Sequence, residues 1–239
     1  MNREYYANKM NTMLQDSSTY KEINEKISKA TKSKINKLIQ KHKNCLLEEE
    51  ISFLLDFEQK ESNLYGLPKI HKSNIIKEKI IEQNSEYIIV RNPDDLKFRP
   101  IIAGPESSTS RLSHLVDLLL KDLPQTTKSH VRDDIDFLSK LQRNLQKEHK
   151  YSLVTFDVES LYTNIDQELA IEAITYWLQK HADIKHPRFT NEFICDAVKL
   201  VLENNTFFFN DKLYIQTNGT AMGTKMAPTY ANLVLAYLE

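Results

Sequence analysis

The chain has 239 residues, of which 41% are hydrophobic and 27% charged, a composition typical of globular proteins that bury a sizeable core. Its apolar runs are too short to cross a bilayer, and its N-terminus lacks the apolar region of a signal peptide, so we expect an intracellular protein without a membrane partner. The formal net charge of −1 lacks the basic excess of a dedicated nucleic-acid binder. The two cysteines have no zinc-type spacing, which disfavours a disulfide framework or a structural metal site.

The first 62 residues repeat apolar positions at helical spacing and predict a helical N-terminal extension. Eight lysines lie between Lys21 and Lys43 against two glutamates. A lysine-rich helix is either a solvated surface or a surface that follows phosphate groups, and both interpretations stay open. All four glycines and all seven prolines lie downstream of Leu64, where short apolar runs alternate with turns.

The middle of the chain predicts a hairpin of strands 87–90 and 97–103 around a turn at 92–95. Helices are expected from 112 to 120 and from Asp134 to Leu145. An apolar run at 151–158 predicts a buried strand. Amphipathic helices should begin near Asp166 and Thr190, a second hairpin should join 206–209 to 212–216, and a helix should follow Pro228.

Three groups of residues could support chemistry. Asp157 ends the apolar run 151–158, with Tyr162 five residues later, and a rigidly placed carboxylate can hold Mg²⁺. Segment 216–228 joins a strand to a helix through Gly219 and Gly223, which let the backbone approach a ligand closely. Segments 65–72 and 97–102 carry cations that could clamp a triphosphate. Taken singly, each group is also compatible with a turn, a connection or surface charge.

In this order the groups resemble the motifs of reverse transcriptases. Segments 67–69 and 98–101 resemble the two fingers motifs, 157–162 resembles the first palm motif, and 219–228 resembles the second. Three residue sequences are similar to those of the reverse transcriptases of Penelope-like retroelements in particular. They are Leu-Tyr-Gly-Leu-Pro-Lys-Ile-His-Lys, Asp-Val-Glu-Ser-Leu-Tyr-Thr-Asn-Ile and Gly-Thr-Ala-Met-Gly-Thr-Lys-Met-Ala-Pro. The resemblance runs from about Leu64 to Glu239.

The resemblance implies an RNA-directed DNA polymerase, a nucleotidyltransferase with two Mg²⁺ ions, an RNA template, a DNA primer, deoxynucleoside triphosphates and a nuclear location. Asp157 would be the catalytic carboxylate and metal ligand, assisted by the Val158 carbonyl. Nucleotide-binding roles would fall to a further set of residues: Lys69, Arg99, Tyr162, Gly219, Met222 and Gly223. Among these, Tyr162 would exclude the ribose 2′-hydroxyl by its bulk, and Met222 stands where many reverse transcriptases have glutamine, which puts a polar contact there in doubt.

The implied fold is α+β, with a helical extension (1–62), the fingers (63–150) and a partial palm (151–239) of a right-hand polymerase. The third palm motif, an aromatic-x-Asp-Asp hairpin, and the thumb are absent from these residues. The pair Asp133 and Asp134 precedes the first palm motif and is expected to cap a helix. With one catalytic carboxylate the chain alone should be inactive. The alternatives are a non-catalytic RNA- or DNA-binding remnant, and a viral-type RNA polymerase or a domesticated polymerase-like protein.

Overall fold

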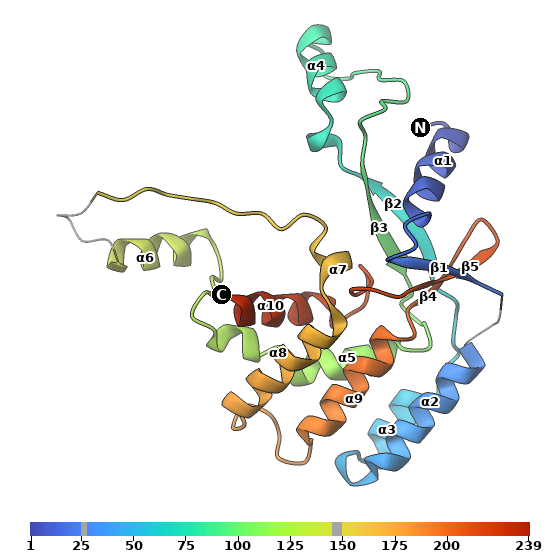
Figure 1. Ribbon diagram of the computed structural model, residues 1–239, viewed down its shortest axis with the longest axis vertical. Coiled ribbons are helices and arrows are strands. Elements are labelled where there is room, and N and C mark those ends of the chain that lie inside the picture. The colour runs from blue at the N-terminus through green and yellow to red at the C-terminus, as the bar shows by residue number, and fades with distance from the viewer. Residues whose placement is uncertain (25–27, 145–149) are drawn as a thin grey trace.

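The computed structural model describes residues 1–24, 28–144 and 150–239. Within these ranges the chain forms ten α-helices and one mixed sheet of five strands, which agrees with the predicted α+β class (Figure 1). None of the helices in the described ranges combines the length and the apolar character that a bilayer span requires.

The sheet has the strand order β1-β5-β4-β2-β3. Every neighbouring pair is antiparallel except β2 and β4, which run parallel. The strands in chain order are β1 (Tyr20–Ile23), β2 (Asn63–Pro68), β3 (Phe98–Ala103), β4 (Thr206–Phe209) and β5 (Lys212–Gln216). β1 and β3 therefore form the two edges, and the outer side of β3 carries an isolated bridge from Ile101 to Met222.

The hairpin of β4 and β5 was predicted and is confirmed. Asn210 and Asp211 form its two-residue turn with φ values of 47° and 60°. Positive φ at both central positions is the feature of the hairpin turns that match strand twist, and asparagine and aspartate tolerate it better than most residues.

The predicted hairpin of 87–90 with 97–103 is wrong. β3 pairs instead with β2, in register from Asn63 opposite Ala103 to Pro68 opposite Phe98, while 87–90 has no regular structure. Glycine and proline within β2 are weak strand formers, so the local sequence did not predict a strand there. The connection contains a 3₁₀ turn (Ile70–Lys72) and α4 (Asn74–Gln83), which lies beyond the far end of the hairpin (Figure 1).

Four helices pack into the main hydrophobic core, three of them by the apolar stripes that the sequence predicted and the fourth in the place where a helix was expected after Pro228. They are α5 (Ser110–Leu120), α8 (Gln167–Lys180), α9 (Asn191–Leu202) and α10 (Ala227–Leu238). Asp166 and Thr190 cap α8 and α9 by accepting from the amides of Leu169 and Phe193. The Trp177 indole donates to the Leu233 carbonyl over 2.9 Å and fixes α8 against α10. A 3₁₀ turn (Leu123–Thr126) follows α5.

The N-terminal segment is helical at α1 (Arg3–Leu14), α2 (Ser28–Lys41) and α3 (Glu48–Leu55), with a 3₁₀ turn (Lys43–Cys45) between the last two. It also contributes β1, which helical periodicity did not predict. Met10 and Leu14 of α1 join a second core against the sheet, whereas α2 packs on α9. The N-terminal segment thus shares both cores with the rest of the chain.

The predicted buried strand at 151–158 is wrong, because this segment has no regular structure and its side chains are exposed, Phe156 to 94%. A strand is stable only when a neighbour satisfies its backbone groups, and no described strand pairs with this segment. The segment projects from the helices together with α6 (Asp134–Asn144) (Figure 1). Asp133 caps α6 through the Asp136 amide at 2.8 Å, as the capping interpretation expects, and Leu145 lies outside the described residues.

The start of α4 depends on Asp95. Its carboxylate accepts from the Ser73 hydroxyl at 2.6 Å and from the amides of Asn74 at 2.6 Å and Ile75 at 3.2 Å. These hydrogen bonds, the one from Ser73 foremost, hold the pKa of Asp95 below its ordinary value of 3.8.

We expect this cap to be intact above the ordinary carboxyl pKa and to be lost as the pH falls through the lowered pKa of Asp95, because protonation removes the acceptor charge. The amide signals of Asn74 and Ile75 should therefore titrate with a midpoint below 3.8 in ¹H–¹⁵N spectra. Asp95→Asn should abolish that titration and Asp94→Asn should leave it. A midpoint at or above the ordinary value would contradict the capping role.

Candidate functional site

Three cations lie on one face of the β2–β3 hairpin. Arg99 stands opposite Leu67, and the Lys69 amide donates to the Lys97 carbonyl over 2.8 Å. Residues two apart on a strand point to the same face, and directly opposite residues share a face. Lys69, Lys97 and Arg99 therefore share one face, so the hairpin register brings together the two cations that the sequence assigned to a triphosphate.

The Lys69 ammonium experiences repulsion from its neighbours. Partial burial lowers its pKa, the charges of Arg99, Lys72 and Lys97 lower it further, and Glu159 acts in the opposite direction. Like charges that are held together by the backbone attract an anion, because a bound anion relieves their mutual repulsion. This end of the hairpin is thus suited to hold an anionic group.

Asp157 lies at the cationic end of the hairpin, although it is not on a strand. Its carboxylate is 3.5 Å from the Lys72 ammonium, and Glu159 is equally close to the Lys97 ammonium. The Asp157 side chain is 85% exposed, so this ion pair contributes little to stability. Val158 lies beside it, also exposed. The prediction that Asp157 lies on a strand is therefore wrong, whereas Asp157 does lie beside a cation of segment 65–72, Lys72.

Tyr162 is joined to the glycine loop 219–223. It lies on α7 (Leu161–Asn164), not on an open turn, and its side chain packs half-buried against the helical core. Its carbonyl accepts from the Thr220 amide over 2.7 Å. Gly219 has φ +66°, and a Cβ there would be 2.1 Å from the Tyr162 carbonyl oxygen. Only glycine fits this contact without moving backbone.

The other end of the same loop is joined to β3. The Ile102 amide donates to the Met222 carbonyl over 2.7 Å, and Ile101 and Met222 form an isolated parallel bridge. Gly223 has φ +126°, and a Cβ there would be 2.3 Å from the Ile102 carbonyl oxygen. Met222 thus contributes its backbone to the contact, which does not depend on a polar side chain at that position.

β3 connects the two parts of the site. Arg99 and Ile102 are three residues apart on one strand, which corresponds to about 10 Å. Asp157 contacts the cationic end of the hairpin and Tyr162 contacts the glycine loop, so β3 links both through contacts at its two ends.

Sequence reasoning gave no individual role to three residues of this site, Lys72, Lys97 and Glu159. Lys72 and Lys97 lie within the two cation-bearing segments 65–72 and 97–102, and Glu159 lies within the motif that begins at Asp157. The ion pairs of the two lysines with Asp157 and Glu159 link segments that lie 62 or more positions apart. No periodicity in the sequence signals such pairs.

The described residues do not build a complete site for two Mg²⁺ ions. Asp157 offers one carboxylate, a suitable hard ligand, with the Val158 carbonyl beside it. The described residues contain one group of three possible metal ligands, His42, Glu192 and Asp196, and it lies between α2 and α9. There the Lys41 ammonium is 2.7 Å from both carboxylates, which raise its pKa to about 12, so a cation already occupies that position.

Comparison with protein-family models, with curated proteins and with solved structures gives no match for this chain. The motif resemblance and the geometry of the site therefore carry the functional interpretation together.

Proposed function

We propose that the chain carries the fingers (63–150) and part of the palm (151–239) of an RNA-directed DNA polymerase of the Penelope-like type. Its partners are an RNA template, a DNA primer and deoxynucleoside triphosphates. The proposal rests on motifs whose order and residue sequence resemble the motifs of those reverse transcriptases. It also rests on the contacts that these motifs make with one another in space.

One observation supports the proposal most strongly. The glycine loop touches the backbone of both other motifs, at Tyr162 through Gly219 and at Ile102 through Gly223. Each contact excludes a Cβ, so the two glycines are needed where the segments meet. Unrelated surface loops have no reason to meet at two glycines, whereas a nucleotide-binding cleft needs these segments together.

Each residue has a binding role in this proposal. Lys69 and Arg99 hold the triphosphate, Lys as a point charge and Arg by its planar fork. Tyr162 lies against the sugar and excludes a 2′-hydroxyl by bulk. Gly219, Met222 and Gly223 present backbone to the base pair.

In this proposal Asp157 is the ligand that binds magnesium. Its carboxylate and the Val158 carbonyl would hold an ion, and the ion would neutralise phosphate charge during nucleotidyl transfer. The exposed carboxylate beside Lys72 is open to such a ligand. One carboxylate leaves a two-ion centre incomplete, so we expect nucleotide binding, not primer extension, from these 239 residues alone.

Calorimetric titration with dTTP, with Mg²⁺ or with a chelator, tests the assignment. Lys69→Ala and Arg99→Ala should each weaken binding about tenfold in both conditions, since each removes a charge-assisted contact. Asp157→Asn should tighten binding about twofold in the chelator, because it removes repulsion and frees Lys72. With Mg²⁺ the same variant should weaken binding about tenfold or more, because an ion ligand is lost.

Two control variants distinguish this outcome from general charge effects. Glu159→Gln changes the same charge two residues away and should act alike with and without Mg²⁺. Lys79→Ala removes a lysine from α4 and should leave the affinity unchanged. An Asp157→Asn effect of the same sign in both conditions would exclude a metal-binding role for Asp157.

A second function, non-catalytic nucleic-acid binding, is favoured by one observation. The cations of the hairpin are held in place by its register, whereas the single carboxylate lies on an exposed segment without regular structure. A remnant of this kind would bind an RNA–DNA hybrid with an affinity that falls steeply with salt and is indifferent to Mg²⁺ and to dTTP. The same titrations therefore separate the two functions.

A further inference from the structure

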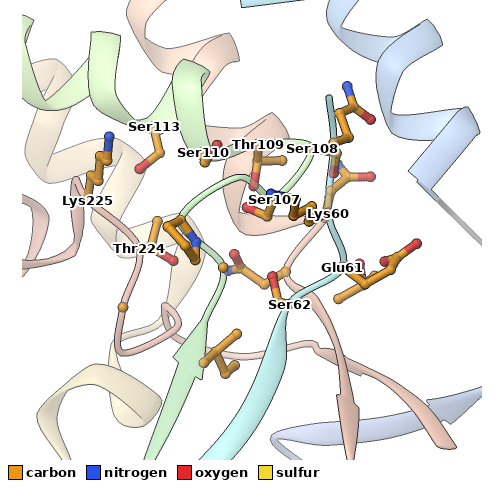
Figure 2. Close-up of a pocket in the computed structure, with 18 of the residues that line it drawn as sticks. Lys60, Glu61, Ser62, Ser107, Ser108, Thr109, Ser110, Ser113, Thr224 and Lys225 are labelled. Carbon is orange, nitrogen blue, oxygen red and sulfur yellow. The ribbon is translucent and has the colours of Figure 1, made fainter. Parts of the chain in front are cut away.

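A cavity of about 590 Å³ lies between the first turn of α5, segment 59–62 before β2, and the chain that follows Gly223 (Figure 2). It lies behind the contact of Gly223 with Ile102, both of which line it. Its walls are rich in hydroxyl groups, among them those of Ser62, Ser107, Ser108, Thr109, Ser110 and Thr224. Three lining residues, Gly223, Thr224 and Lys225, belong to segment 216–228, but the sequence predicted no cavity there.

Several hydrogen-bond donors of the wall lack partners. The Ser110 hydroxyl, the Asn205 side-chain amide and the Gln59 side-chain amide are buried and have no hydrogen-bond partner within the described ranges. Ser110 is only 7% exposed and Asn205 only 6%. An unsatisfied buried polar group lowers the stability of the folded chain by about 1–3 kcal/mol. Three such groups around one cavity are unusual for a wall that has only a structural role.

The start of α5 adds a favourable field for an anion. α5 has 11 residues, and its N-cap Thr109 makes no side-chain capping hydrogen bond. The N-terminus of a helix carries partial positive charge on its free amides and attracts phosphate groups. Ser110 is the first residue of this helix, so its unpartnered hydroxyl and the helix N-terminus lie at the same wall.

The charged residues around the cavity are mostly basic. Lys32 and Lys225 line it and make no ion pair within the described ranges. Lys60 is neutralised by Glu106. Glu61 is the one carboxylate of the lining. Two free ammonium groups and uncharged donors around one carboxylate fit an anion better than a metal ion.

We propose that this cavity binds a phosphate group. The several acceptor oxygens of a phosphate can accept hydrogen bonds from the hydroxyl and amide donors together. Its negative charge is attracted by Lys32, by Lys225 and by the N-terminus of α5. The site is separate from the hairpin cations and does not depend on the proposed polymerase function. The phosphate can belong to a nucleic-acid strand or to a free phosphate compound.

Titration of the ¹⁵N-labelled chain with inorganic phosphate, and separately with an eight-residue single-stranded DNA, at constant ionic strength tests the proposal. Inorganic phosphate should shift the amide signals at the start of α5. Lys225→Glu and Ser110→Ala should each weaken phosphate binding about tenfold. Lys37→Glu reverses the charge of an exposed lysine on α2 that does not line the cavity and should have no effect.

The Ser110→Ala variant separates binding from folding. Removing an unsatisfied buried hydroxyl should leave the melting temperature unchanged or raise it, while phosphate binding weakens. If the DNA shifts the same amides and phosphate competes with it, the source is a nucleic-acid strand. If phosphate alone binds there, the source is a free phosphate compound. Absent shifts at α5, or shifts that survive both variants, overturn the proposal.

Discussion

Replacing Gly223 by alanine should lower the free energy of unfolding by about 3 kcal/mol, the upper range for a forced backbone conformation. The melting temperature of a chain of this size should then fall by about 6–12 °C. The new Cβ would lie 2.3 Å from the Ile102 carbonyl oxygen, and φ of +126° is unfavourable for any L side chain. The Ile102 backbone cannot move aside as the end of a flexible side chain can, so the contact between the glycine loop and β3 should be lost. Thermal unfolding measured by circular dichroism checks the value.

Gly66→Ala is the matched control. Its Cβ would approach the Met10 sulfur at 2.4 Å, and Gly66 has no positive φ. Because a methionine side chain is flexible, the cost should be about 1 kcal/mol. Gly219→Ala should resemble Gly223→Ala, since it meets Tyr162 backbone at φ +66°. If Gly66→Ala proved as harmful as Gly223→Ala, the loop contacts would not have the special role given to them.

The second large effect concerns catalysis. When the chain is joined to a C-terminal segment that supplies an aromatic-x-Asp-Asp motif and a thumb, it should extend a DNA primer on RNA. Asp157→Asn should reduce that extension by about 10⁴-fold, the scale on which loss of one member of a catalytic unit acts, because charge is lost at nearly constant volume. The 239-residue chain alone should show no extension with Mg²⁺ or Mn²⁺. Gel analysis of a labelled primer measures both.

Two variants make this result specific. Glu159→Gln removes a charge from the same exposed segment and should retain most of the activity. Tyr162→Ala should keep part of the DNA synthesis and admit ribonucleotides, because it removes the bulk beside the sugar together with part of the packing against the helical core. Primer extension that survives Asp157→Asn would eliminate Asp157 as the catalytic carboxylate.

Local patterns in the sequence determined most of the helices, α4 and α7 excepted, and one hairpin. The apolar stripes of α5, α8 and α9 predicted both their helical form and the faces that they bury, because each segment repeats apolar residues with a period of 3.6. Helices begin near Asp166 and Thr190 as predicted, and both residues cap the helices that follow them, since capping acts over three residues. Asn210 and Asp211 similarly identified the turn of β4 and β5. Each of these features depends on neighbours in the chain.

Tertiary structure alone decided the pairing of β2 with β3, the failure of 151–158 to form a strand, and the cavity beside α5. A strand needs a partner strand, and the residues of one strand do not indicate which distant segment will pair with it. The motif order indicated that Lys69, Arg99, Asp157 and the glycine loop belong together, but the ion pairs of Lys72 and Lys97 and the contacts of Gly219 and Gly223 depend on how separate segments pack. Packing depends on the three-dimensional fit of the whole chain, for which no local pattern can substitute.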